Sequence, residues 1–185
     1  MIEKRKSRRI IDQGSFITYV EDRVILPNQK EAKRVFVLHP GAAAILALTP
    51  DHHIILTYKY RYPIQKVSCE IPAGKFNYPG EDPQACALRE LEEETGYSTK
   101  DITLYQTMYP ALGYSNEILY IFLAKDCFKV EHPLQPDDDE FIEPVLVTKS
   151  DAKKMLEKQE ILDSKTLIAL QKYLWEESVY AEQKR

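Results

Sequence analysis

The sequence predicts an α+β fold, in which a mixed β-sheet is flanked by helices and preceded by a β-hairpin extension. Two observations support this prediction. Alternating apolar and polar residues dominate the first half of the chain, which is typical of strands. Segments with helical periodicity are few and are interleaved with further strand-like segments, which favours one sheet covered on both faces.

The composition fits a single domain with extensions. The 185 residues are 44% hydrophobic and 29% charged, enough to bury one core of ordinary size. A net charge of -4 provides no basic field for a nucleic-acid backbone, so we expect no nucleic-acid partner. No apolar run approaches the ~20 residues that span a bilayer, and the amino terminus lacks the apolar core of a signal peptide. We therefore expect a cytoplasmic protein without a membrane partner.

The cysteines argue against a disulfide framework and against a structural zinc site. Cys69, Cys86 and Cys127 form an odd set with no CxxC spacing. We expect all three to be reduced residues that pack in the core.

The first predicted element is a hairpin at residues 15–26 and 32–38, whose alternating segments flank the turn PNQK. The basic residues 1–9 are expected to form a flexible terminus. We accordingly divide the chain into a hairpin region, residues 1–40, and a main domain, residues 41–185.

Further strands and helices follow from the same periodicities. A second strand pair surrounds the turn TPDHH, and a helix capped by Ser150 and another capped by Asp163 or Ser164 close the chain. The predicted strands are 41–48, 54–62, 101–109, 117–127 and 141–148, and the last helices cover 151–160 and run through 167–175.

A helix is also predicted between these strands, just before residue 96. Asp82 is a good N-cap, Pro83 suits the first helical position, and Gly96 is placed to end the helix. Glu90, Glu93 and Glu94 then share one face of it.

Such a cluster of like charges requires a compensating cation. Each like-charged pair at these spacings destabilises a helix by roughly 0.2 to 0.5 kcal/mol, and Arg89 neutralises only part of the charge. Glutamate oxygens that converge beside an open loop suit a hard cation such as Mg²⁺. The alternative is a solvated acidic face on a surface helix.

The segment from Gly74 to Tyr97 resembles the Nudix box, which decides between these alternatives. Glu81, the seven residues after it, the run from Arg89 to Glu94, Gly96 and Tyr97 all match that pattern. Six residues instead of five separate Gly74 from Glu81, which indicates a longer exposed loop.

The resemblance extends over most of the chain and narrows toward the ADP-ribose pyrophosphatases and nucleoside diphosphate sugar hydrolases. It is carried by the hairpin and by HPGAAAILAL, KYRYP, EIPAGK, LGYSNE and DDDEFIE. It implies an α/β/α sandwich and hydrolysis of a diphosphate bond. ADP-ribose would give AMP and ribose 5-phosphate.

The resemblance also implies a set of metal ligands. Glu90 and Glu94 would be the main ligands of Mg²⁺, or of Mn²⁺, with Glu93 as a further ligand, direct or through water. The carbonyl of Ala73 would complete the site, Glu81 would support it, and Arg89 would orient the glutamates.

A general base has to come from elsewhere, because a metal-bound carboxylate is a poor proton acceptor. The acidic run at residues 137–140 is the obvious source. Glu140 is the candidate base by analogy with the family, and Asp138 or Asp139 would assist. The alternative is a solvated acidic loop.

Substrate contacts are expected from three further residues. Arg61 suits a diphosphate because its planar fork binds pairs of oxygens, and Glu70 and Glu117 are placed to contact the sugar or the metal. Phe16 and Tyr19 could stack a base. Leu112 stands where ADP-ribose enzymes usually carry proline, which leaves open a preference for GDP-mannose or a broader range of nucleotide sugars.

The hairpin implies a homodimer. In the resembling enzymes it exchanges with a second subunit, and a lone two-stranded hairpin would bury its apolar residues poorly. A catalytically silent nucleotide-binding module is the alternative of another class. The complete set of box carboxylates argues against this alternative, because a protein that only binds nucleotides gains nothing from negative charge clustered near a phosphate.

Overall fold

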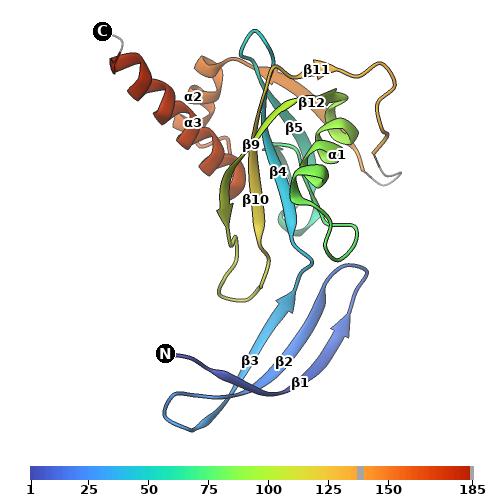
Figure 1. Ribbon diagram of the computed structural model, residues 1–185, viewed down its shortest axis with the longest axis vertical. Helices are drawn as coiled ribbons and strands as arrows, with labels where there is room; N and C mark the ends of the chain where they lie inside the picture. The colour runs from blue at the N-terminus through green and yellow to red at the C-terminus, as the bar shows by residue number, and fades with distance from the viewer. Residues whose placement is uncertain (137–139, 184–185) are drawn as a thin grey trace. The chain divides into compact units, whose positions relative to one another are not determined.

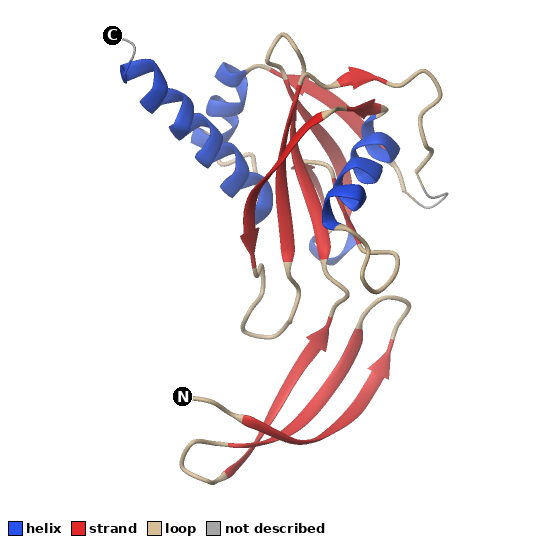
Figure 2. Cartoon of the chain, in the orientation of Figure 1, coloured by secondary structure: helices blue, strands red, loops and turns tan. Residues whose placement is uncertain are grey.

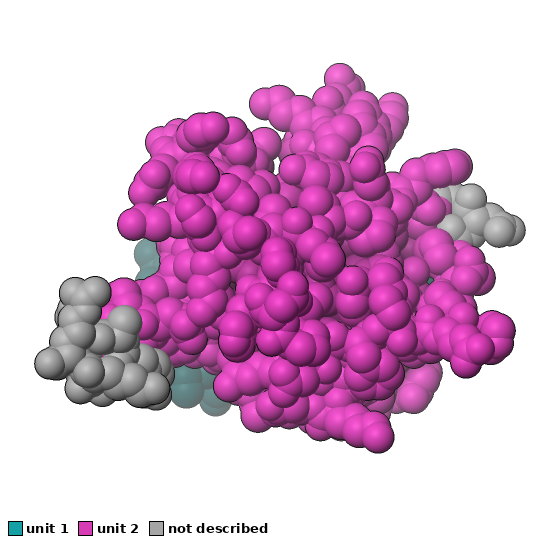
Figure 3. Space-filling model, turned by 90° about the horizontal axis from the view of Figure 1, so that it is seen from above, with its two compact units in different colours: residues 1–41, 109–119 teal, residues 42–108, 120–185 magenta. Residues whose placement is uncertain are grey.

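The computed structural model describes residues 1–136 and 140–183, and the chain separates into two compact units. The first unit comprises residues 1–41 and 109–119, and the second comprises residues 42–108 and 120–185 (Figure 3).

The first unit is built on a three-stranded antiparallel sheet in the order β1-β2-β3. Central strand β2 pairs with both neighbours, and its Val20 is fully buried. The strands are β1 (Lys4–Gln13), β2 (Thr18–Ile25) and β3 (Glu31–Leu38).

Strand β1 corrects the expectation of a flexible terminus and of a hairpin with only two strands. Every residue of β1 is exposed, which explains why its sequence resembles that of a flexible, solvated terminus. The strand forms because its backbone pairs with β2 and because Arg8 makes two hydrogen bonds to Asp22, of 2.7 and 2.8 Å.

The loop at residues 109–119 is hydrogen-bonded to the end of β3. The amide of Val37 donates to the carbonyl of Tyr114 at 2.8 Å, and the amide of His39 donates to Asn116 Oδ1 at the same distance. These bonds hold residues 114–116 in the loop, and the strand predicted from residue 117 begins instead at Leu119.

The second unit contains a seven-stranded sheet. Its main path is β12-β5-β4-β10-β9, with β6 paired to β5 and β7 paired to β4 (Figure 1). The strands are β4 (Ala42–Leu48), β5 (Ile54–Arg61), β6 (Lys66–Glu70), β7 (Ala73–Lys75), β9 (Asp101–Met108), β10 (Leu119–Lys125) and β12 (Ile142–Val147).

Several short elements were not predicted from the sequence. Besides β6 and β7, they are the 3₁₀ helix η1 (Tyr62–Ile64) and the small pair formed by β8 (Tyr97–Ser98) and β11 (Phe128–Lys129). The partners of β7, β8 and β11 are distant in the sequence, so local periodicity carries little sign of these strands, whereas β6 forms a hairpin with β5 across η1.

Helices cover both faces of the sheet, which confirms the predicted sandwich (Figure 2). Helix α1 (Pro83–Thr95) packs on one face, where its Cys86 and Leu91 join Ile45 of β4 in the core. Helices α2 (Lys149–Glu157) and α3 (Ser164–Gln183) lie on the other face. None of the helices in the described part of the chain is long and apolar enough to cross a membrane.

The helix ends agree with the predictions to different degrees. Asp82 caps α1 by accepting from the amide of Ala85 at 2.8 Å, and Gly96 ends it with φ 69°, as predicted. Helix α2 is capped by Thr148 instead of Ser150. Helix α3 continues beyond Trp175.

The three cysteines are free and buried, as predicted.

Candidate active site

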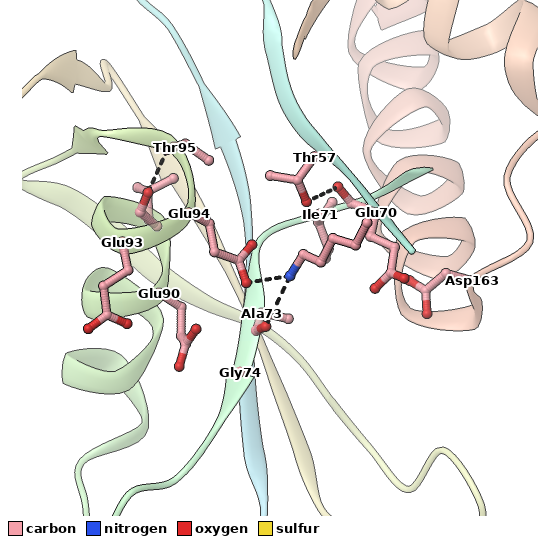
Figure 4. Close-up of polar contacts among 12 residues, drawn as sticks. Thr57, Glu70, Ile71, Ala73, Gly74, Glu90, Glu93, Glu94, Thr95 and Asp163 are labelled. Carbon is pink, nitrogen blue, oxygen red and sulfur yellow. Dashed lines mark hydrogen bonds and ion pairs between the residues drawn. The ribbon is translucent and has the colours of Figure 1, made fainter. Parts of the chain in front are cut away.

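Helix α1 directs its acidic residues toward the strands on which it packs. Glu90 and Glu94 are buried, with 7% and 4% of their surface exposed, whereas Glu93 is half-buried. Figure 4 shows Glu94 pointing toward Ala73 of β7, with Glu90 beside it on the same helix. One turn of helix separates the two buried carboxylates, so a single face of α1 presents both of them.

Gly74 is adapted to Glu90. A β-carbon at residue 74 would lie 2.0 Å from Glu90 Oε1 and 2.3 Å from Oε2, which is far inside van der Waals contact. Glycine therefore leaves the space that the carboxylate fills. The longer loop before Glu81 is closed by the amide of Asn77, which donates to Glu81 Oε2 at 2.5 Å.

Arg89 contacts three of the box glutamates. Its guanidinium lies 2.7 Å from Glu90, 2.8 Å from Glu93 and 3.5 Å from Glu81. Although burial alone would lower the pKa of Arg89, the charges of Glu90 and Glu93 raise it above its ordinary value. Arg89 is thus fully charged and holds the carboxylates in place, which supports its predicted orienting role.

Lys59 of β5 brings a second cation to the same cluster. Its ammonium donates to Glu94 Oε1 in a short ion pair and lies 3.5 Å from the carbonyl oxygen of Ala73. Both side chains are almost completely buried. Lys59 therefore contacts two of the groups assigned to the metal.

The oxygen donors of this cluster fit a hard divalent cation. Glu94 Oε2 is buried and finds no hydrogen-bond partner within residues 1–136 and 140–183. Burial raises the pKa of Glu94 to about 7 in spite of Lys59, so the carboxylate is short of positive charge. Burial likewise raises the pKa of Glu90.

The glutamates of this cluster are not gathered as a complete set of metal ligands. In the described ranges, no three acidic, histidine or cysteine side chains are close enough together to hold a metal ion. The cations explain this separation, because Arg89 lies between Glu90 and Glu93 while Lys59 lies against Glu94. A metal ion would take over part of these contacts.

A second charged network lies beside the first. Arg61 makes two hydrogen bonds of 2.7 Å to Glu70, and Lys165 of α3 contacts the same carboxylate and Asp163. Burial alone would raise the pKa of Glu70, but the hydrogen bond from Arg61 and the charge of Lys165 bring it well below its ordinary value.

Helix α3 also fixes the segment that follows Glu70. The hydroxyl of Thr166 accepts from the amide of Ile71 at 2.9 Å, and Asp163 in turn accepts from the amide of Thr166 at the same distance. The strand that carries Ala73 and Gly74 is therefore anchored on the first turn of α3.

Glu140, the candidate base, lines a cavity of about 300 Å³ together with Lys59 and Arg61. The exposed rings of Tyr62 and Phe141 border the same cavity. Asp137, Asp138 and Asp139 lie outside the described residues.

The remaining predicted site residues lie in the first unit. Glu117 is half-buried, and its amide donates to the hydroxyl of Ser115 at 3.1 Å. Phe16 packs edge-on against His39, and Leu112 is 81% exposed. Their roles at the site remain predictions.

Sequence analysis missed Lys59 and Lys165, the two lysines that form ion pairs with Glu94 and Glu70. Lys59 alternates with Ile55 and Thr57 along β5, so it lies on the face that α1 covers. This alternation could have identified Lys59 from the sequence, whereas no comparable pattern marks Lys165.

Comparisons with known proteins agree with this architecture. A family model described as NUDIX domain matches residues 37–170. The ADP-ribose pyrophosphatase of Bacillus subtilis (strain 168) is 43% identical over 181 residues, which cover 97% of each chain. The methanol dehydrogenase activator of Bacillus methanolicus is 39% identical over 169 residues, or 91% of each chain.

A solved structure supports the fold. The crystal structure of an ADP compounds hydrolase matches with a TM-score of 0.78 and covers 98% of this chain and 96% of that one, at 21% identity. The family match spans most of the chain and includes the complete helix α1. The chain therefore belongs to the Nudix family, as the resemblance of residues 74–97 implied.

Proposed function

We propose that this protein hydrolyses the diphosphate bond of ADP-ribose or of other nucleoside diphosphate sugars, and that it needs a divalent metal ion. The observation that carries the proposal is the pair of buried carboxylates, Glu90 and Glu94, on the helix that packs beside Ala73 and Gly74. The similarity to ADP-ribose pyrophosphatases along nearly the whole chain supports it.

The metal would be Mg²⁺, with Mn²⁺ as a substitute. Glu90, Glu94 and the carbonyl of Ala73 would hold it, and Glu93 would add a direct or water-mediated contact. When bound, such an ion neutralises charge on a diphosphate and lowers the pKa of a water molecule. Oxygen donors and an orphaned carboxylate oxygen suit a hard cation.

Residues of the chain would bind and orient the substrate. Arg61 keeps 44% of its side chain exposed while Glu70 holds two of its nitrogens, so its orientation is fixed. Its Nη1 donates to none of residues 1–136 and 140–183 and would be available to phosphate oxygens. Glu140 borders the same cavity and is the proposed general base. A carboxylate oxygen of Glu140 would accept the proton of the attacking water as the new bond to phosphorus forms and the bridging P–O bond of the diphosphate breaks, with the second half of the substrate leaving as a phosphate monoester.

The range of substrates is set by the groups that contact the sugar and base. Leu112 replaces the proline that is usual in ADP-ribose enzymes, so we propose a range that includes GDP-mannose or other nucleotide sugars besides ADP-ribose. Glu117 is the proposed sugar contact in that loop.

The test is the release of nucleoside monophosphate from a panel of substrates. ADP-ribose, ADP-glucose, GDP-mannose, UDP-glucose, dinucleotides and nucleoside triphosphates would be incubated with Mg²⁺, with Mn²⁺ and with chelator. We expect metal-dependent cleavage of the diphosphate sugars. Binding of these nucleotides without turnover on any of them would favour the silent binding module instead.

We also propose that the active form is a homodimer in the cytoplasm. Ile10, Tyr19 and Val35 are exposed on the three-stranded sheet of the first unit, and a second copy of the chain would cover such apolar side chains. Three free cysteines fit a reducing compartment. Light scattering that finds only monomer at micromolar concentration would contradict the dimer.

A further inference from the structure

We propose that Lys59 is an internal counter-ion that competes with the divalent metal for Glu94 and Ala73, and that its ammonium has to leave before a metal ion binds there. The inference rests on the proposed function, because it requires a metal site at these groups. It concerns a residue outside the glutamate cluster of the box.

The contacts of Lys59 place its ammonium on the metal's ligands. The ammonium contacts Glu94 Oε1 and lies 3.5 Å from the carbonyl oxygen of Ala73. These oxygens come from α1 and β7, which are separate in the sequence and are brought together by the fold. A cation that coordinates both oxygens takes the place of the ammonium, because two positive charges in one buried position repel each other strongly.

Burial explains why a counter-ion is needed. Glu94 is 4% exposed and Lys59 is 9% exposed, so neither charge is well solvated. An isolated buried carboxylate is strongly disfavoured, and a lysine built into the sheet supplies the missing charge wherever no metal is bound. The box can therefore fold before metal arrives.

The structure also provides space for the displaced side chain. Lys59 lines the cavity of about 300 Å³ that Arg61 and Glu140 border. Lysine suits this exchange, because its flexible stem lets the ammonium move without any change in the backbone. In the cavity the ammonium would face the side where the proposed diphosphate binds.

The competition has a measurable size. The apparent affinity for metal is reduced by the fraction of molecules in which the ammonium has left the two oxygens. If that fraction is about a tenth, removal of the ammonium tightens metal binding about tenfold.

The experiment measures Mn²⁺ binding by calorimetry to the full chain and to three variants, without substrate. Lys59→Met removes the ammonium and keeps most of the side-chain volume, and Lys59→Gln keeps a donor and serves if the methionine variant does not fold. Lys165→Met is the matched control, since Lys165 is equally buried, with 11% of its side chain exposed against 10% for Lys59. It pairs with Glu70, outside the proposed ligand set.

We expect Lys59→Met to bind Mn²⁺ about tenfold more tightly than the wild type, and Lys165→Met to bind it as the wild type does. The melting temperature of Lys59→Met should fall in chelator and recover in Mg²⁺ by more than that of the wild type. Unchanged or weaker Mn²⁺ binding by the Lys59 variants, with normal binding by the wild type, would overturn the inference alone. A wild type that binds no Mn²⁺ and cleaves no diphosphate sugar would overturn the proposed function itself.

Discussion

The carboxylate of Glu90 fills the space in which a β-carbon of residue 74 would stand. The two positions are far apart in the sequence, yet a methyl group on Gly74 would lie 2.0 Å from Glu90 Oε1. The glycine of the box thus leaves room for the Glu90 side chain, and the longer loop that follows Gly74 leaves this relationship intact.

Gly74→Ala tests that relationship. The added methyl should push the Glu90 carboxylate aside, which costs the fold about 1 kcal/mol because the far end of a glutamate can move. Activity should fall about 10- to 100-fold, since a displaced ligand weakens the metal site. Gly14→Ala is the control, because its β-carbon would meet its nearest neighbour, the carbonyl oxygen of Ile17, at an ordinary 3.4 Å. Equal activity in the two variants would contradict the role of Gly74.

Arg89→Lys should destabilise the protein and lower its activity. Lysine cannot reproduce the planar fork that reaches Glu81, Glu90 and Glu93 together, and at least one buried carboxylate would lose its partner. We expect a loss of about 1 to 3 kcal/mol in the free energy of unfolding in urea. Lys153→Ala, which breaks an exposed pair with Glu157, should have no measurable effect.

Glu94→Gln should abolish turnover and leave the protein folded. The amide keeps the volume of the side chain but removes the negative charge from the proposed metal site. Hydrolysis with Mg²⁺ and the circular dichroism spectrum would be measured together. Glu92→Gln makes the same change on the same helix, where the carboxylate accepts from the amide of Leu134, and should remain active. Near-normal rates in Glu94→Gln would refute its assignment as a metal ligand.

Glu140→Gln should slow the chemical step about 10²- to 10⁴-fold, because the amide cannot accept a proton from water. Binding of Mn²⁺ should be unchanged. The pH dependence of kcat should lose the limb that reports the base, and an unaltered profile would count against Glu140. Glu143→Gln, an exposed change on neighbouring β12, is the control and should retain the wild-type rate.

The network around Glu70 should make stability depend on acidity. The pKa of Glu70 in the folded state lies below its unfolded value of roughly 4.3, so its ion pairs stabilise the fold fully above that pH. Their contribution is lost as the pH falls through the folded-state pKa. Glu70→Gln should cost about 2 to 3 kcal/mol at pH 7. Urea unfolding at pH 7 and at pH 3 should show the difference from the wild type shrinking at the lower pH, and a constant difference would contradict the assignment.

The elements that sequence analysis predicted well are those that depend on neighbouring residues. Helix α1 begins after Asp82 and ends at Gly96 because capping and glycine conformation act within one turn. The box glutamates share a face for the same local reason.

What the sequence concealed depends on partners distant in the chain. Strand β1 exists because β2 offers it a hydrogen-bonding edge and Asp22 pairs with Arg8. Lys59 belongs to the site because α1 lies over β5, which places Glu94 beside it. Pairings of this kind require the register of the sheet, and a single sequence does not specify that register.

The anchoring of Ile71 by Thr166 has a consequence for biosynthesis. The segment with Gly74 and the glutamate helix are translated before α3, whereas the hydroxyl that anchors Ile71, just before that segment, belongs to α3, 95 residues further along the chain. A nascent chain still attached to the ribosome before α3 emerges therefore lacks the contacts of Thr166 and Lys165. Such a chain lacks this anchor of the site, so we expect the site to form completely only after α3 has emerged.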